Sequence, residues 1–170
     1  VKIDTEFNLN NLRHNSDVNV FLNNYRSLRA DQILDWITKL YEKYGKVPGG
    51  INSNNTRKTF LFFTSLTAGN TLGITHLEHN LWGNVFTIFH SGLLDEHTIV
   101  HECAHSLSLP HIFDDDLSQF PFYWGYTDNY MDYTWQRGEN DSRGGFFSTG
   151  DNTYKGKMYS FFKWQWDIMR

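Results

Sequence analysis

Three residues near the middle of the chain have the types and the spacing of a metal-dependent hydrolytic site. Residues 101–105 read His-Glu-Cys-Ala-His, so His101 and His105 stand four positions apart and Glu102 follows the first of them. On a helix, residues four apart lie on one face, where two imidazoles can bind a single metal ion. Glu102 is rotated by about 100° from His101. It would therefore flank the metal, where the general base for a water molecule stands.

A third ligand has to come from beyond this helix. His97 lies on the same face as His101, but His97 and His105 would be about 12 Å apart along the helix axis, whereas zinc–nitrogen bonds are about 2.0–2.1 Å. Pro110 cannot continue the helix, which leaves His111 free to turn back toward the metal. Three neutral imidazoles and one water molecule form an open, catalytic type of zinc site.

Residues 101–111 resemble the long zinc-binding motif of metzincin metallopeptidases, H-E-x-x-H-x-x-G-x-x-H. Members of that family carry a methionine-containing turn beneath the metal, and residues 129–133 here read Asn-Tyr-Met-Asp-Tyr. The resemblance implies one catalytic Zn²⁺ ion held by the three histidines, with Met131 forming the floor beneath them. It also implies that Tyr133 approaches the zinc and stabilises the tetrahedral intermediate.

Residues 72–77 resemble the edge strand of the same family, along which a substrate peptide pairs in extended form. The resemblance implies that Gly73, Ile74 and Thr75 bind substrate. The family's pocket beside the zinc is walled by residues around the methionine turn, which implies a role for residues 122–135, Tyr130 among them.

One position departs from the family motif. Ser108 stands where the family has glycine, at the turn between the helix and the third ligand. That turn normally needs a left-handed backbone, which costs a non-glycine residue about 1 kcal/mol. We expect the site to tolerate this cost, with a slight shift of the third ligand as one consequence.

Two rival third ligands are compatible with the sequence. Residues 125–130 loosely resemble the aspzincin pattern G-T-x-D-x-x-Y, which would make Asp128 a ligand in place of His111. Glu139, the single glutamate after the zinc helix, is a weaker candidate of the gluzincin type. The motif position favours His111.

Two further groups of polar residues could bind a metal ion, but each also has a commoner, purely structural explanation. His76, His79 and His90 could form a second metal site, although isolated surface or strand histidines are commoner. Residues 114–116 are three aspartates that could hold calcium, although a solvated acidic loop is the commoner arrangement.

The composition excludes several classes of protein. A net charge of −4 and a pI of about 6.0 argue against a nucleic-acid partner. Cys103 is the single cysteine, which excludes internal disulfides and zinc sites built on several thiolates. No apolar run approaches the ~18 residues needed to span a membrane. The chain begins with Val rather than Met, so we expect a domain of a longer protein that is secreted or delivered outside the producing cell.

The pattern of apolar residues predicts the elements that position these side chains. Residues 27–44 have helical spacing, and Gly45 is expected to end that helix in a left-handed conformation. Residues 59–66, 71–77 and 84–90 are predicted strands. Residues 18–22 are interpreted as a short strand or a lead-in, residues 47–57 as a loop, and residues 136–153 as mostly loop. Residues 154–170 are predicted to be helical, with apolar candidates for burial at Met158, Phe161, Phe162, Trp164, Trp166 and Ile168.

This order predicts an α+β fold in a single catalytic domain spanning residues 1–170. The resemblance implies a metzincin-like mixed, twisted sheet with an N-terminal helix and the active-site helix. An upper lobe of about residues 1–108 and a smaller, irregular lower lobe of about residues 109–170, ending in a helix, would enclose the zinc cleft.

The predicted function is that of a zinc-dependent endopeptidase, which hydrolyses peptide bonds with zinc-activated water and Glu102 as the base. One alternative is a zinc amidase or peptidase acting on peptidoglycan peptides as a secreted bacterial toxin. Residues 161–166 resemble the end of metallopeptidase toxin domains that close large bacterial secreted proteins. That alternative implies an immunity or inhibitor protein as partner, beside the protein or peptide substrate. A catalytically silent binding module is a third alternative, against which the intact Glu102 and histidines argue.

Overall fold

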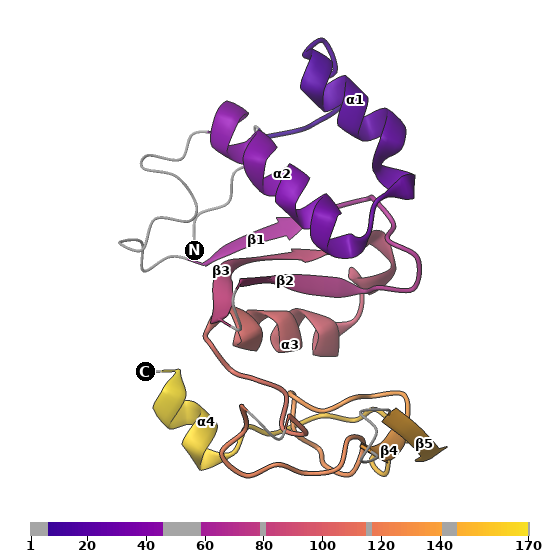
Figure 1. Cartoon of the computed structure of the whole chain (residues 1–170), viewed down its shortest axis with the longest axis vertical. Coiled ribbons are helices and arrows are strands. Elements are labelled where there is room, and N and C mark those ends of the chain that lie inside the picture. Colours follow the sequence, from indigo (N-terminus) through magenta and orange to yellow (C-terminus); the bar gives the residue numbers. More distant parts are fainter. Residues whose placement is uncertain (1–6, 46–58, 79–80, 115–116, 141–145, 170) are drawn as a thin grey trace.

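A mixed three-stranded sheet with a helix on each face is the centre of the fold (Figure 1). The computed structural model describes residues 7–45, 59–78, 81–114, 117–140 and 146–169. The strands are β1 (Phe60–Phe63), β2 (Gly73–Glu78) and β3 (Leu81–Ile88), in the order β1-β3-β2. β1 runs parallel to β3, and β2 runs antiparallel to it. The predicted α+β class is therefore confirmed.

The first helix stands where a short strand or a lead-in was expected, and the strand alternative is wrong. Residues 18–22 lie inside α1 (Ser16–Asn24), not in a strand. Val18 and Phe21 are three residues apart and both are buried, whereas Asn19, Val20 and Asn23 are exposed. This is the helical period of burial. A run of five residues is too short to separate it from strand alternation.

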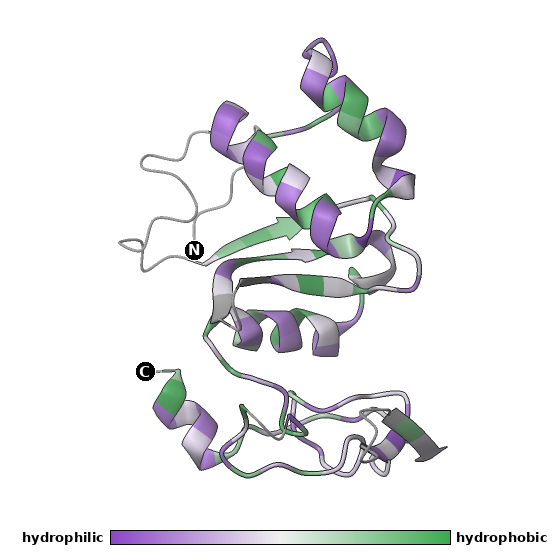
Figure 2. Ribbon diagram, viewed as in Figure 1, coloured by the Kyte–Doolittle hydropathy of each residue, from purple (hydrophilic) through white to green (hydrophobic). Residues whose placement is uncertain are grey.

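The second helix, α2 (Ala30–Tyr44), confirms the predicted amphipathic helix and covers one face of the sheet (Figure 1). Its hydrophilic and hydrophobic residues alternate around its turns in Figure 2. The Gln32 side chain accepts a hydrogen bond from the Arg29 amide at 2.9 Å and so caps the first turn. Gly45 does follow the last turn, but its backbone is extended rather than left-handed (φ −78°, ψ 166°). A Cβ at this position would meet the Tyr41 carbonyl oxygen, so close approach favours glycine here.

The third helix, α3 (Glu96–Ser106), lies on the opposite face of the sheet from α2 and carries the His-Glu-x-x-His pattern (Figure 1). Asp95 precedes its first turn and accepts a hydrogen bond from the Thr98 hydroxyl. Within the described residues β2 is the edge strand next to α3, with Ile74 opposite Thr87 and Thr75 opposite Phe86 on β3. The edge position expected for residues 72–77 is thus confirmed, with the strand beginning at Gly73.

The chain after α3 lies below that helix and is mostly irregular (Figure 1). Residues 136–153 are not simply a loop, because β4 (Arg137–Asn140) and β5 (Phe146–Gly150) pair there as an antiparallel hairpin. The helix predicted over residues 154–170 is wrong in its length, since α4 covers only Lys163–Ile168. Met158 is buried, but Trp166 and Ile168 are 52% and 43% exposed. The loop at 47–57 lies outside the described residues.

A separate hydrophobic cluster holds this lower part against the end of α3. Its buried members are Ala104, Leu109, Ile112, Phe113, Trp124 and Met131. In the described part of the chain, no helix combines the length and the apolar character needed to cross a membrane.

Candidate metal centre

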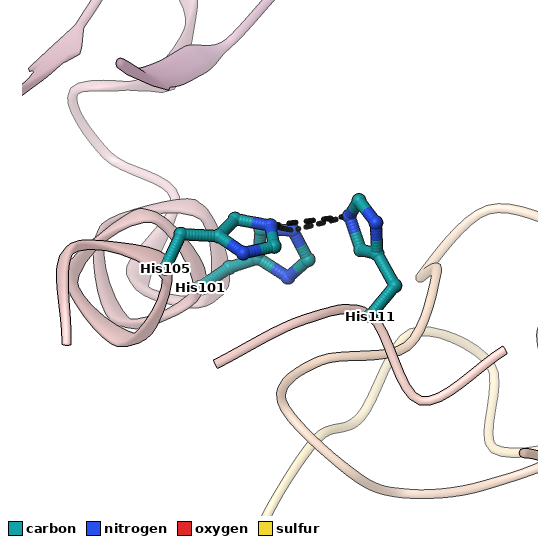
Figure 3. Close-up of side chains that lie close together, drawn as sticks. All are labelled: His101, His105 and His111. Atoms are coloured by element: carbon teal, nitrogen blue, oxygen red, sulfur yellow. Dashed lines mark hydrogen bonds between the residues drawn. The ribbon is translucent and has the colours of Figure 1, made fainter. Parts of the chain in front are cut away.

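Two ligands of the candidate metal centre stand on α3, and a turn after the helix supplies the third (Figure 3). The helix ends with hydrogen bonds from the Ser108 amide to the His105 carbonyl and from the Leu109 amide to the Ala104 carbonyl. This pair of bonds is the Schellman motif, which needs a left-handed residue at the Ser108 position. Ser108 has φ +72°, which confirms the predicted backbone conformation at the site of the family's glycine.

This turn brings three ring nitrogens to one point. The Nε2 atoms of His101 and His105 are 3.1 Å apart, and each lies 3.2 Å from Nε2 of His111. Figure 3 shows the three rings pointing toward one another. Within the described residues these histidines form the one group of His, Cys, Asp or Glu side chains that could hold a metal ion.

Main-chain carbonyl groups fix the orientation of two of these rings. His101 Nδ1 is 2.7 Å from the Tyr130 carbonyl oxygen, and His105 Nδ1 is 2.6 Å from the Leu109 carbonyl oxygen. A carbonyl can only accept, so each Nδ1 carries the proton and each Nε2 presents a lone pair. Backbone carbonyl partners of this kind orient histidine ligands in metal sites.

The arrangement of these nitrogens suits a small divalent ion. Two neutral Nε2 acceptors cannot hydrogen-bond to each other, so their close approach leaves facing lone pairs that a cation would satisfy. In a tetrahedral zinc site with bonds of about 2.0–2.1 Å, ligand nitrogens stand about 3.3 Å apart. The separations of 3.1–3.2 Å are close to that value. The residues therefore fit a metal ion.

Burial keeps the three imidazoles neutral. Desolvation lowers the pKa of His101 and His105 well below the usual value, and repulsion between the neighbouring rings lowers both further. Burial lowers the pKa of His111 to about 4. Neutral imidazole is the form that binds metal, so these histidines have no proton to lose before they bind at neutral pH.

Glu102 lines the same cleft as the three histidines, with 9% of its surface exposed. Burial raises the pKa of its carboxyl group to about 7, although hydrogen bonds from Thr75 act in the opposite direction. A carboxyl group with a pKa near neutrality can both take up and release a proton, which suits a general acid–base group.

The expected methionine turn, residues 129–133, contacts one ligand through the Tyr130 carbonyl oxygen, which lies 2.7 Å from Nδ1 of His101. Met131 is fully buried beside Ala104 and Leu109, and its carbonyl accepts a hydrogen bond from the Ile112 amide. The ring centroid of Tyr133 lies 5.5 Å from that of His111. Both residues are thus near the histidines, and Tyr133 also lines the cleft.

Buried polar side chains that the sequence analysis did not identify hold this turn in place. The Asp132 carboxylate accepts hydrogen bonds from the Gly125, Thr127 and Tyr133 amides. The Asn129 side chain bonds to Gln165 of α4 at 2.6 Å. A buried polar residue must find partners, but sequence alone does not show which residues these partners are.

The predicted substrate-binding residues separate into two groups. Gly73, Ile74 and Thr75 line the cleft, which has a volume of about 740 Å³, but the buried hydroxyl of Thr75 faces Glu102 rather than open space. Tyr130 lies outside the residues that line this cleft. Its carbonyl oxygen contacts His97 and His101, and its ring stacks on that of His97.

The rival ligands lie elsewhere. Asp128 accepts a hydrogen bond from the Ser160 hydroxyl at 2.9 Å, and Glu139 is exposed on β4. His76 lies 3.4 Å from Asp35 of α2, and His90 is exposed. His79 and two of the three aspartates at 114–116 lie outside the described residues.

Comparisons with known proteins found no protein-family model that matches this chain, and no curated protein and no solved structure that is significantly similar to it.

Proposed function

We propose that the chain is a zinc-dependent endopeptidase of metzincin-like type. The observation that carries the proposal is the meeting of three Nε2 atoms, 3.1–3.2 Å apart, in a cleft that also contains the Glu102 carboxyl group. Three imidazole ligands suit zinc, and a three-ligand set leaves a coordination position open for catalysis. The methionine turn in contact with His101 and the glycine-like turn at Ser108 favour the metzincin type.

The edge strand supports a peptide as the substrate. Within the described residues β2 pairs only with β3, so its outer side offers main-chain donors and acceptors to an extended chain. Residues 70–75, which include the start of this strand, line the cleft, and the Thr75 side chain contacts Glu102. A peptide pairing with β2 would therefore pass the histidines with its main chain in reach of Glu102.

The chain's own residues would carry the proton transfers. A bound Zn²⁺ would supply Lewis acidity toward a water molecule and toward the substrate carbonyl group. Glu102 accepts the proton of the attacking water on its carboxylate and delivers it to the leaving nitrogen. The raised pKa of Glu102 suits both steps. Tyr133, which lines the cleft beside His111, would donate a hydrogen bond to the developing oxyanion.

The experiment compares cleavage of casein by the zinc-loaded parent and by Glu102→Gln. We expect the variant to bind one zinc per chain and to lose at least about 100-fold in kcat, as expected for the loss of a general base. Glu96→Gln is the matched control, because Glu96 is an exposed glutamate on the same helix. Equal cleavage by parent and Glu102→Gln would overturn the proposed role of Glu102. Cleavage of muropeptides but not of casein would favour the peptidoglycan alternative.

A further inference from the structure

The strongest contact between the edge strand and the candidate acid–base group is made by Thr75. The Thr75 hydroxyl lies 2.6 Å from Oε2 of Glu102 and 2.9 Å from the main-chain oxygen of the same residue. The hydroxyl has one proton to donate, and a charged carboxylate is the stronger of the two acceptors. Thr75 is 3% exposed, so little water is available to replace this hydrogen bond.

A second residue of β2 shapes the space for the same side chain. A Cβ at Gly73 would lie 2.8 Å from Cγ of Glu102 and 2.8 Å from a methyl carbon of Thr98. Such distances are too short for carbon atoms in contact. The Glu102 methylene groups therefore pack against the bare backbone of Gly73, two residues before the hydroxyl that holds the carboxylate.

We propose that Thr75 is a positioning residue that fixes the Glu102 carboxylate in the orientation used for catalysis, while Gly73 leaves room for the rest of the side chain. This inference rests on the proposed function. A glutamate side chain has several rotatable bonds, and ordering it costs conformational entropy. The two contacts from one strand already order the Glu102 side chain in the folded protein, so this entropy is lost on folding and not when substrate binds.

This role differs from the substrate contact that the family resemblance implies for Thr75. A substrate contact made by the hydroxyl would raise KM when the hydroxyl is removed, because it would act on bound substrate. A positioning contact acts on Glu102 and would lower kcat with little change in KM. The change expected for a partner that orients an active-site group is about 10–100-fold.

The test uses the zinc-loaded protein and three variants. Thr75→Val keeps the shape of the side chain and removes the hydroxyl, whereas Thr75→Ser keeps the hydroxyl. Thr87→Val is the matched control, because Thr87 is a fully buried threonine of β3 that donates to the Phe62 carbonyl at 3.0 Å. We expect Thr75→Val to lose about 10–100-fold in kcat while KM and zinc affinity stay near those of the parent. Thr75→Ser should restore most of the loss.

A second readout does not depend on turnover. The carbon-13 resonance of the Glu102 carboxyl group, assigned by its absence in Glu102→Gln, should move in Thr75→Val and stay in place in Thr75→Ser and Thr87→Val. An unchanged resonance and an unchanged kcat in Thr75→Val would overturn the positioning role, as would a rise in KM alone. A shifted resonance in a protein whose parent cleaves no peptide would support the contact and refute the proposed function instead.

Discussion

The Nε2 atom of His105 lies 3.1 Å from the Nε2 atom of His101, and both rings point their Nδ1 atoms at main-chain carbonyl oxygens. The two carbonyl groups belong to Tyr130 and Leu109, which lie beyond the helix that carries the histidines. The turn after α3 and the methionine turn therefore fix the side of each ring that is offered to a metal. Both Nε2 lone pairs are thereby directed to one point, where a metal ion would bind.

Removal of His111 should weaken zinc binding strongly. His111→Ala leaves only the two helical ligands, and we expect the zinc dissociation constant to rise by more than about 100-fold, the upper end of the effect of removing an outer partner. Competition with a chromogenic chelator measures the constant. His90→Ala is the control, because His90 is exposed and lies outside the three-histidine group. Equal affinities in the two variants would contradict the assignment of His111.

The metal-free protein should lose stability in acid. Each of the three histidines has a lower pKa folded than its usual value of about 6.5. The unfolded chain therefore binds more protons below about pH 6.5. The stability that the neutral histidines contribute is complete above that pH and is lost as the pH falls, for His111 down to about pH 4. Protonation of Glu102, whose pKa is raised to about 7, stabilises the folded protein as the pH falls. The three histidines together outweigh this single opposing group.

Urea unfolding of the metal-free parent and of His111→Gln measures this effect. The pKa of His111 falls from 6.5 to about 4 in the folded state, which corresponds to a pH-dependent change of up to about 3 kcal/mol. The parent should lose more stability than His111→Gln between these two pH values. Identical pH profiles would show that His111 is not desolvated in the folded protein.

The helix α2 and the pair of helical histidines, His101 and His105, could be predicted from the sequence because both depend on local patterns. Helical spacing identifies α2, and the four-residue interval places His101 and His105 together. The hairpin of β4 and β5 could not be predicted, because glycine, asparagine and serine favour turns in isolation. The first of these strands lies against Trp124, a residue outside the local pattern: the Gly138 amide donates to the Trp124 carbonyl, and a Cβ at Gly138 would meet the Trp124 ring. The His101–Tyr130 and Thr75–Glu102 contacts could not be predicted either, because their residues are 29 and 27 positions apart and meet only in the folded chain. The His105–Leu109 contact is local, but it depends on the turn that follows the helix.

Glycine at position 108 should stabilise the protein. Ser108 has φ +72°, a conformation that costs a residue with a side chain about 1 kcal/mol. Glycine removes this strain, but it also raises the entropy of the unfolded chain, which offsets part of the gain in stability. Ser108→Gly should therefore raise the free energy of unfolding by about 0.5–1 kcal/mol without weakening zinc binding. Ser65→Gly, at an exposed position outside the left-handed region, should give no gain. A loss of stability in Ser108→Gly would contradict the strain at this turn.

Alanine at Gly73 should disturb Glu102 without touching a metal ligand. The added Cβ would lie 2.8 Å from Cγ of Glu102, so the carboxyl group must move or the strand must shift. We expect kcat to fall by about 10-fold or more while the protein still binds one zinc ion. Gly69→Ala adds a methyl group where no atom lies within 4 Å, and its φ of +58° makes that substitution cost stability. The kcat of the folded, zinc-loaded Gly69→Ala protein should nevertheless stay near that of the parent. A Gly73→Ala variant with the parent's kcat would refute the tight packing against Glu102.

The most direct test of the central claim is a zinc titration of the metal-free protein, followed by the rate of casein cleavage. The proposed function predicts no cleavage without metal, a linear rise in rate with added zinc, and a plateau at one ion per chain. A chelator should return the rate to zero. Cleavage that does not depend on zinc, or a protein loaded with one zinc ion that cleaves neither casein nor a peptide library, would contradict it.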